Sequence, residues 1–156
     1  FAILYIDIDR FKAYNDHYGF LRGDEFLQSV SQLIGDASRN ASDDAAFIGH
    51  VGGDDFVVVV APEFSAPVAD AIVAAFDAAV PAFYDVADRE RGYIEVTDRR
   101  GELQRFGMLT LSIGIASTAK RAFQHYAEAV AVATEMKQYT KGSETSSWVL
   151  DRRSGE

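Results

Sequence analysis

Two short acidic clusters are the residues of this sequence best suited to chemistry. Asp54 and Asp55 follow two glycines, and apolar runs flank this group at 47–51 and 57–60. Glycine supplies the positive φ that a tight turn needs and β-branched residues favour strands, so the segment predicts a β-hairpin with two carboxylates at its tip. The other cluster, Asp7 and Asp9, closes the apolar run 1–6.

Carboxylates at strand ends are poor core material and good ligands for a hard cation such as Mg²⁺. If the two strand ends lie side by side, they form a metal site of the kind that phosphoryl transfer uses. The residues alone therefore make a metal-dependent phosphoryl-transfer site the leading hypothesis.

Strands and helices alternate along the chain around these clusters. The pattern predicts strands at 1–7, 47–51, 57–60, 108–116 and 147–150 and helices from about 9 to 19, 24 to 35, 65 to 80 and 123 to 141. Asp9, Asp24 and Ser65 are the expected N-caps, and 36–44 is an expected loop. The order βααββαβ, with helices on one face of a sheet, predicts an α+β fold.

The segment 84–105 is longer than a simple connection requires. Its two short β-prone stretches flank Asp98 and Gly101, so we expect a small extra hairpin. A connection of this length is a solvated decoration, a regulatory element or a dimer contact.

The composition limits the classes of function. The chain has 156 residues, enough for one domain, and no cysteine. The net charge of −9 disfavours binding to a nucleic-acid polymer but permits a small phosphorylated ligand. No apolar run is expected to span a membrane and no signal peptide is visible, so we expect a cytoplasmic protein without membrane contact.

Residues 7–24 read D-I-D-R-F-K-A-Y-N-D-H-Y-G-F-L-R-G-D, and residues 52–56 read G-G-D-D-F. Together they resemble the GGDEF family of diguanylate cyclases, whose pattern is D-x-D-x-F-K-x-x-N-D-x-x-G-H-x-x-G-D followed by the G-G-D-E-F turn. The resemblance covers residues 1 to about 150 and implies a palm-like, ferredoxin-like domain of the adenylyl-cyclase and polymerase-palm type. The family's usual N-terminal lead-in is absent, so we expect an upstream sensory or receiver domain to be missing, and 151–156 to be a frayed tail.

The resemblance also assigns roles to single residues. It implies a homodimer that condenses two GTP into cyclic di-GMP, with Mg²⁺ or Mn²⁺ held by Asp7, Asp54 and the carbonyl oxygen of Ile8. The residues implied in catalysis are Asp54, Asp55 and Lys12. Those implied in nucleotide binding are Phe11, Lys12, Asn15, Asp24, Gly52, Gly53, Lys137 and Lys141, with Asn15 and Asp24 reading guanine and the lysines contacting phosphates.

Four positions depart from the family pattern. Asp55 replaces glutamate and is shorter by about 1.5 Å, one C–C bond. His50 and Lys141 stand where arginines are usual, and Phe20 replaces a histidine. The arginine of the family's inhibitory product site is missing from 43–46, so we expect no product inhibition there.

These departures leave an alternative open: a catalytically degenerate GGDEF module that binds GTP and Mg²⁺ and acts as a regulatory or dimerisation domain. A more distant reading is another palm-type domain with a G-G-D-D turn, such as that of a CRISPR effector. The block from Asn15 to Asp24 argues against the distant reading.

Overall fold

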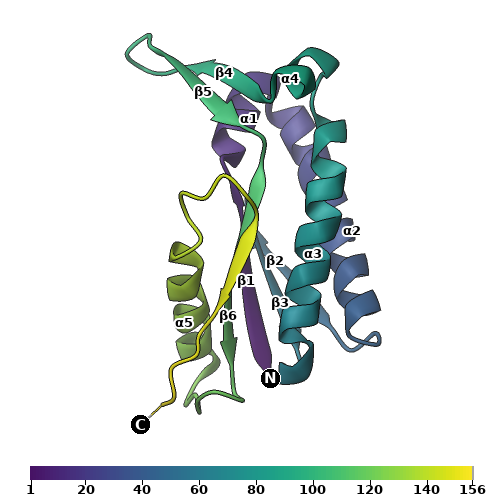
Figure 1. Ribbon diagram of the computed structural model, residues 1–156, viewed down its shortest axis with the longest axis vertical. Helices are drawn as coiled ribbons and strands as arrows, with labels where there is room; N and C mark the ends of the chain where they lie inside the picture. The colour runs from purple at the N-terminus through teal and green to yellow at the C-terminus, as the bar shows by residue number, and fades with distance from the viewer. Residues whose placement is uncertain (156) are drawn as a thin grey trace.

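A computed structural model describes residues 1–155 and places the chain around one five-stranded sheet (Figure 1). The strand order is β2-β3-β1-β6-β7, with β6 and β7 parallel and the other neighbours antiparallel. These strands are β1 Ala2–Asp9, β2 Phe47–Gly52, β3 Asp55–Val60, β6 Thr110–Ser117 and β7 Ser147–Leu150. The acidic β1 is thus the central strand.

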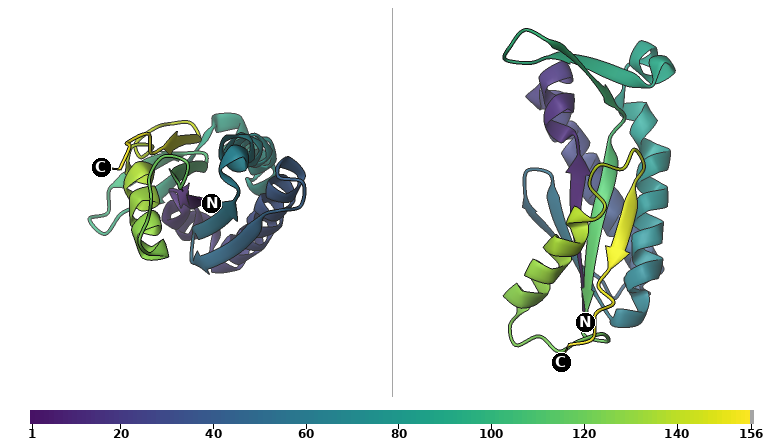
Figure 2. Two further views of the ribbon diagram at one scale, coloured as in Figure 1. Left: turned by 90° about the horizontal axis from the view of Figure 1, so that it is seen from below. Right: turned by 60° about the vertical axis from the view of Figure 1, so that its left-hand side comes forward.

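Helices cover both faces of this sheet, whereas the sequence predicted one face. The helices are α1 Phe11–Tyr18, α2 Phe20–Ala41, α3 Ser65–Ala79, α4 Val86–Arg91 and α5 Tyr126–Gln138. Views from two further directions show α2 and α3 on one side of the sheet and α5 on the other (Figure 2). The α+β palm-like architecture itself is confirmed.

The pleat of β1 explains the two layers, because successive strand residues point to opposite faces. Ala2, Leu4, Ile6 and Ile8 enter the larger core beneath α2 and α3. Ile3 and Tyr5 belong to a smaller cluster with residues of α5. A strand buried on both faces needs helices on both.

Several predicted boundaries are wrong by a few residues. The helix α2 begins at Phe20 and not at Asp24, and it continues through the expected loop to Ala41 because Ile34 and Ser38 stay buried on its inner face. Ser65 is the first residue of α3 and donates to the Pro62 carbonyl, 2.8 Å away, instead of capping the helix. Residues past Gln138 form turns and not helix.

The predicted extra hairpin is confirmed. It consists of β4 Tyr93–Thr97 and β5 Leu103–Gly107, which form a separate two-stranded sheet above α1 (Figure 1). The sequence did not predict α4, the short helix that precedes this hairpin.

The expectation of a frayed tail is wrong at its first residues. Asp151 is buried, and its N–H donates to the Ile115 carbonyl at 2.8 Å. Arg153 forms a two-point ion pair with Glu135. Glu156 lies outside the described residues.

The segment Pro62–Phe83 is long and apolar enough to cross a membrane by length and composition, which the sequence analysis did not expect. Its apolar side chains Val68, Ile72, Phe76 and Val80 are buried against the rest of the fold. This packing accounts for one face of the segment only, since 28% of its most apolar stretch is buried.

A single glycine sets how closely α5 approaches the sheet. A Cβ on Gly114 of β6 would lie 1.8 Å from the Ala133 carbonyl oxygen and 2.4 Å from the Lys137 nitrogen. No side chain fits in that space, so Gly114 allows the helix backbone to rest directly on the strand.

We expect Gly114→Ala to destabilise the protein by about 2–3 kcal/mol, because the added methyl group forces α5 away from β6. Urea unfolding followed by circular dichroism measures the loss. Gly107→Ala is the matched control, since a Cβ there meets no atom within 4 Å. Equal stabilities of the two variants would contradict the close approach of α5.

Candidate active site

The sheet register brings the two acidic clusters together. Asp7 lies opposite Asp55 in the β1–β3 ladder, next to the pair of Ile6 and Phe56. Because Ile6 and Phe56 enter the core beneath α2 and α3, the two aspartates point to the face that α5 covers. The N–H of Ile8 donates to the carbonyl oxygen of Asp54 at 3.1 Å and holds the turn against β1.

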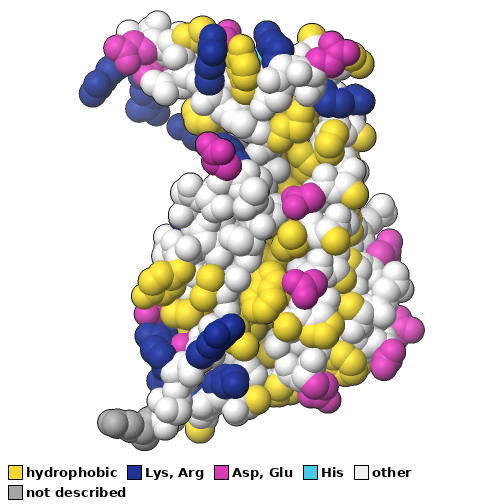
Figure 3. Space-filling view, viewed as in Figure 1, with side chains coloured by type: hydrophobic (Ala, Val, Ile, Leu, Met, Phe, Trp, Pro, Cys, Tyr) yellow, Lys and Arg dark blue, Asp and Glu magenta, His cyan; other side chains and the backbone are white. Residues whose placement is uncertain are grey.

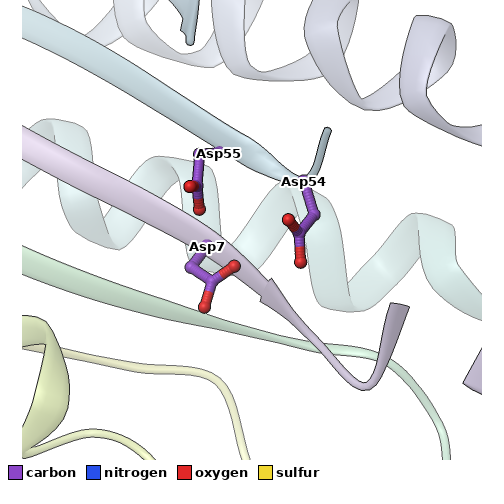
Figure 4. Close-up of side chains that lie close together, drawn as sticks. All are labelled: Asp7, Asp54 and Asp55. Carbon is purple, nitrogen blue, oxygen red and sulfur yellow. The ribbon is translucent and has the colours of Figure 1, made fainter. Parts of the chain in front are cut away.

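Three carboxylates converge at this point. One oxygen each of Asp7, Asp54 and Asp55 lies within 4.8 Å of the others, and the side chains point toward one another (Figure 4). Asp7 is only 9% exposed. Such a set of oxygen donors, from β1, β3 and the turn before β3, fits a hard divalent cation.

Burial and the nearness of like charges raise the pKa values of two of these carboxyls. Burial, followed by the charge of Asp7, raises the pKa of Asp54 to about 6 and raises that of Asp55 as well. A folded-state pKa above the ordinary value means that the ionised group destabilises the fold, increasingly as the pH rises from about 4 to about 6. A bound cation would remove this repulsion.

One lysine on the last turn of α5 and one in the turn after it reach this cluster. The Nζ of Lys137 lies 3.7 Å from Asp7 and 3.9 Å from Asp55, and it sits 4.8 Å from the Tyr5 ring centroid. Lys141 pairs with Asp7. Lys141 is in the turn after α5 and not on the helix face that the sequence predicted, yet both lysines meet at Asp7.

Asp9 does not have the predicted N-cap role and instead contacts β6 and Lys141. The N-cap of α1 is Arg10, in the left-handed region at φ 64°, and not Asp9. The Asp9 carboxylate accepts hydrogen bonds from Thr110 and Ser112 of β6 and lies 2.7 Å from the Nζ of Lys141. Asp9 therefore fixes the lysine beside the acidic cluster.

Asn15 and Asp24 are placed near each other by a close contact of α1 and α2. The Oδ1 of Asn15 is buried without a hydrogen-bond partner among the described residues, and a Cβ on Gly23 would lie 1.7 Å from it. Asp24, the next residue, is exposed inside α2 and has no capping role there. The Asp24 carboxylate is therefore open to a ligand, whereas the Asn15 oxygen is enclosed by the contact with Gly23.

Asp24 and His50 border one cavity of about 490 Å³ between α2 and β2. The His50 ring stacks on Phe56, with centroids 4.5 Å apart, and its Nε2 lies 2.8 Å from the Gly53 carbonyl oxygen. His50 therefore braces the turn from within its own hairpin.

The turn between β2 and β3 leaves its main chain accessible. Gly52 and Gly53 have φ values of 142° and 54°, which favour glycine, and a Cβ on either would meet no atom within 4 Å. A ligand can therefore approach the backbone here closely.

Phe11 and Lys12 open α1 but face opposite ways. The Phe11 side chain is buried and stacks on Phe26, with centroids 6.0 Å apart, so only its main chain can meet a ligand. Lys12 is exposed and borders a second cavity, of about 760 Å³, beneath the β4–β5 hairpin.

Sequence reasoning missed Tyr5 and Gly114. The Tyr5 hydroxyl donates to Asp55 at 3.3 Å, and Gly114 lies opposite Tyr5 in the β1–β6 register. A glycine within an apolar strand signals close backbone approach, so Gly114 could have been found. Nothing in the sequence pattern distinguished Tyr5 from a core residue.

Comparison with known proteins supports the fold and the family. The family model described as diguanylate cyclase, GGDEF domain, matches residues 1–145. The crystal structure of the GGDEF domain of YfiN (TpbB) from Pseudomonas aeruginosa superposes with a TM-score of 0.64 at 25% identity and covers 96% of this chain and 80% of that one. A GGEEF domain of a Vibrio cholerae diguanylate cyclase, at 22% identity and TM-score 0.59, covers 98% and 83% and supports the fold.

Curated relatives match over shorter stretches. An uncharacterized protein of Mycobacterium tuberculosis is 35% identical over 116 residues, or 74% of this chain and 15% of that protein. Diguanylate cyclase DosC of Escherichia coli is 39% identical over 59 residues, or 38% of this chain and 12% of that protein. The chain thus spans less than a fifth of these relatives. Because the family model matches nearly its whole length, the chain belongs to the diguanylate cyclase GGDEF domain family.

Proposed function

We propose that this domain condenses two GTP molecules into cyclic di-GMP with Mg²⁺ or Mn²⁺, as a homodimer. The observation that carries the proposal is the cluster of Asp7, Asp54 and Asp55 with Lys137 and Lys141 beside it. Each 3′-hydroxyl attacks the α-phosphate of the other nucleotide, and two pyrophosphates leave. Such transfers depend on charge neutralisation and positioning.

The residues divide into a metal-binding and a nucleotide-binding set. Asp7, Asp54 and the Ile8 carbonyl oxygen would hold the cation, which neutralises phosphate charge when bound. Asp55, hydrogen-bonded to Tyr5, is the candidate proton acceptor. Lys137 and Lys141, now paired with carboxylates, are free to turn to phosphates once a cation occupies the cluster.

The nucleotide would extend from the Asp24 cavity, across the Gly52–Gly53 turn, to Lys12. The amide of Asn15 and the exposed carboxylate of Asp24 suit guanine, since an amide N–H can donate to O6 or N3 and a carboxylate can accept from N1 and N2. Phe11 would contribute its main-chain N–H.

Two copies are needed because each domain carries one acidic cluster, whereas the product contains two new phosphodiester bonds. We infer that each copy presents one nucleotide to the other, under the control of an upstream sensory or receiver domain. Because GTP is the substrate of this proposal, we expect the domain to act in the cytoplasm. The net charge of −9 favours a small phosphorylated ligand over a nucleic-acid polymer.

Asp54→Ala should reduce cyclic di-GMP formation at least 100-fold, because it removes a carboxylate from the three-residue cluster. Chromatography of products after incubation with GTP and Mg²⁺ measures this effect. Glu63→Ala, which removes an exposed carboxylate elsewhere, should leave the yield unchanged. Equal yields from the Asp54 variant and the unmutated protein would overturn the site. Intact GTP with binding seen by calorimetry would identify the regulatory module instead.

Asp55→Glu should raise turnover several-fold, because the added methylene moves the carboxylate about 1.5 Å further into the cluster. Initial rates of pyrophosphate release provide the measurement, with Asp36→Glu on the exposed face of α2 as control. If the rate does not rise, the shorter side chain of Asp55 does not limit turnover, and the departures at His50 and Lys141 become the candidates.

Mg²⁺ affinity should be about tenfold weaker at pH 5 than at pH 7, because the Asp54 carboxyl, with its pKa raised to about 6, must lose a proton before it binds metal. Calorimetric titration with Mg²⁺ alone, in two buffers of different ionisation enthalpy, would report the released proton. Asp54→Asn should bind weakly and with a smaller pH dependence. An affinity that is constant across this range would refute the assignment.

A further inference from the structure

We propose that the β4–β5 hairpin is part of the nucleotide site, and that Arg99 and Arg100 at its tip bind the terminal phosphates of GTP together with Lys12. The inference rests on the proposed function and adds to it two substrate-binding residues that lie outside the motif segments 7–24 and 52–56. It also gives the segment 84–105 a specific role.

The hairpin and α1 enclose a common cavity. The cavity measures about 760 Å³, and Arg10, Lys12, Arg99 and Arg100 are the basic residues on its wall. A triphosphate end fits this volume. The space-filling view shows the hairpin projecting over a hollow, with Lys and Arg side chains gathered on its projecting end (Figure 3).

Three of the four basic side chains on this wall are available for a ligand. Within residues 1–155, Lys12, Arg99 and Arg100 form no ion pair and donate no side-chain hydrogen bond. In contrast, Arg22 and Arg91 each pair with an aspartate. Arginine binds phosphate oxygens through two parallel N–H groups. Arg99 and Arg100, which have no side-chain partner in the described chain, are therefore well suited to bind a terminal phosphate.

The acidic residues of the cavity wall do not cancel this charge. Asp98 is used by the turn itself, since its Oδ1 accepts the N–H groups of Arg100 at 2.8 Å and Glu102 at 2.9 Å. Asp16 and Glu102 are exposed and not ion-paired in the described chain. Arg10 is likewise committed, since its guanidinium donates to the Met108 carbonyl oxygen at 2.7 Å. Three uncommitted cationic groups therefore face two uncommitted carboxylates.

The hairpin is fastened to the helix that carries Lys12 and Asn15. Buried Asp88 of α4 accepts a hydrogen bond from Tyr18 and pairs with His17, 3.1 Å away, both on α1. The other ring nitrogen of His17 lies 3.1 Å from the Glu95 carbonyl oxygen of β4.

The hydrogen bonds of this attachment also favour the charged form of the Asp88 carboxyl. Although burial opposes its charge, the hydrogen bonds from Tyr18, His17 and Arg91 keep the pKa of Asp88 below its ordinary value. Because α4 and β4 are fixed to α1 in this way, the tip arginines stay near Lys12 without a ligand.

The test compares nucleotides that differ only in their phosphates. The double variant Arg99→Ala/Arg100→Ala should bind 3′-deoxy-GTP, which cannot condense, about tenfold more weakly in the presence of Mg²⁺, and GMP with unchanged affinity. Calorimetry gives the first affinity and competition the second. Lys120→Ala/Arg152→Ala removes two exposed charges elsewhere and should leave both affinities unchanged. Arg99→Lys/Arg100→Lys should recover part of the loss.

The outcomes separate this inference from the proposed function. If the unmutated protein binds 3′-deoxy-GTP and the alanine variant binds it equally well, the hairpin has no phosphate role. An equal loss for 3′-deoxy-GTP and GMP would likewise overturn the inference, because the effect would then not come from the terminal phosphates. Binding of inorganic pyrophosphate that depends on the two arginines, without binding of GTP, would support the anion site and refute the proposed function.

Discussion

The buried charge of Asp7 is the interaction on which the rest of the site depends. Asp7 lies on the central strand, where its neighbours Ile6 and Ile8 enter the core, so its position is fixed by the packing of the whole sheet. An ionised carboxylate in such a place needs a compensating charge. In this structure Lys137 and Lys141 provide it, and a cation can take over that role.

The requirement to balance that charge explains several features that look unrelated. The lysines reach the sheet because α5 rests directly on β6 at Gly114. Asp9 and the hydroxyls of Thr110 and Ser112 orient Lys141. The ammonium of Lys137 packs on the Tyr5 ring, which in turn hydrogen-bonds Asp55. Carboxylates and lysines thus form one coupled network, so a change in one ionisation state alters the others.

The proposed nucleotide-binding surface around this network combines a braced turn with a hairpin that is attached to α1. The turn at Gly52 and Gly53 is braced by His50, whereas the arginine that the family usually has at this position would extend a charge toward the ligand. On the opposite side, the hairpin after α4 brings arginines that the family motifs do not include.

The sequence by itself determined the hairpin at 47–60, the acidic strand ends, the extra hairpin and the family, because each is encoded in local turn chemistry, alternation or a contiguous motif. Only the tertiary structure decided which groups face one another. The N-cap role expected of Asp9 was lost to its contacts with β6, a strand about a hundred residues away. The start of α2 at Phe20 follows Gly19, whose φ of 90° separates α1 from α2, and no side chain caps it. Local patterns specify elements, whereas contacts between distant segments depend on a fold that no short stretch of sequence contains.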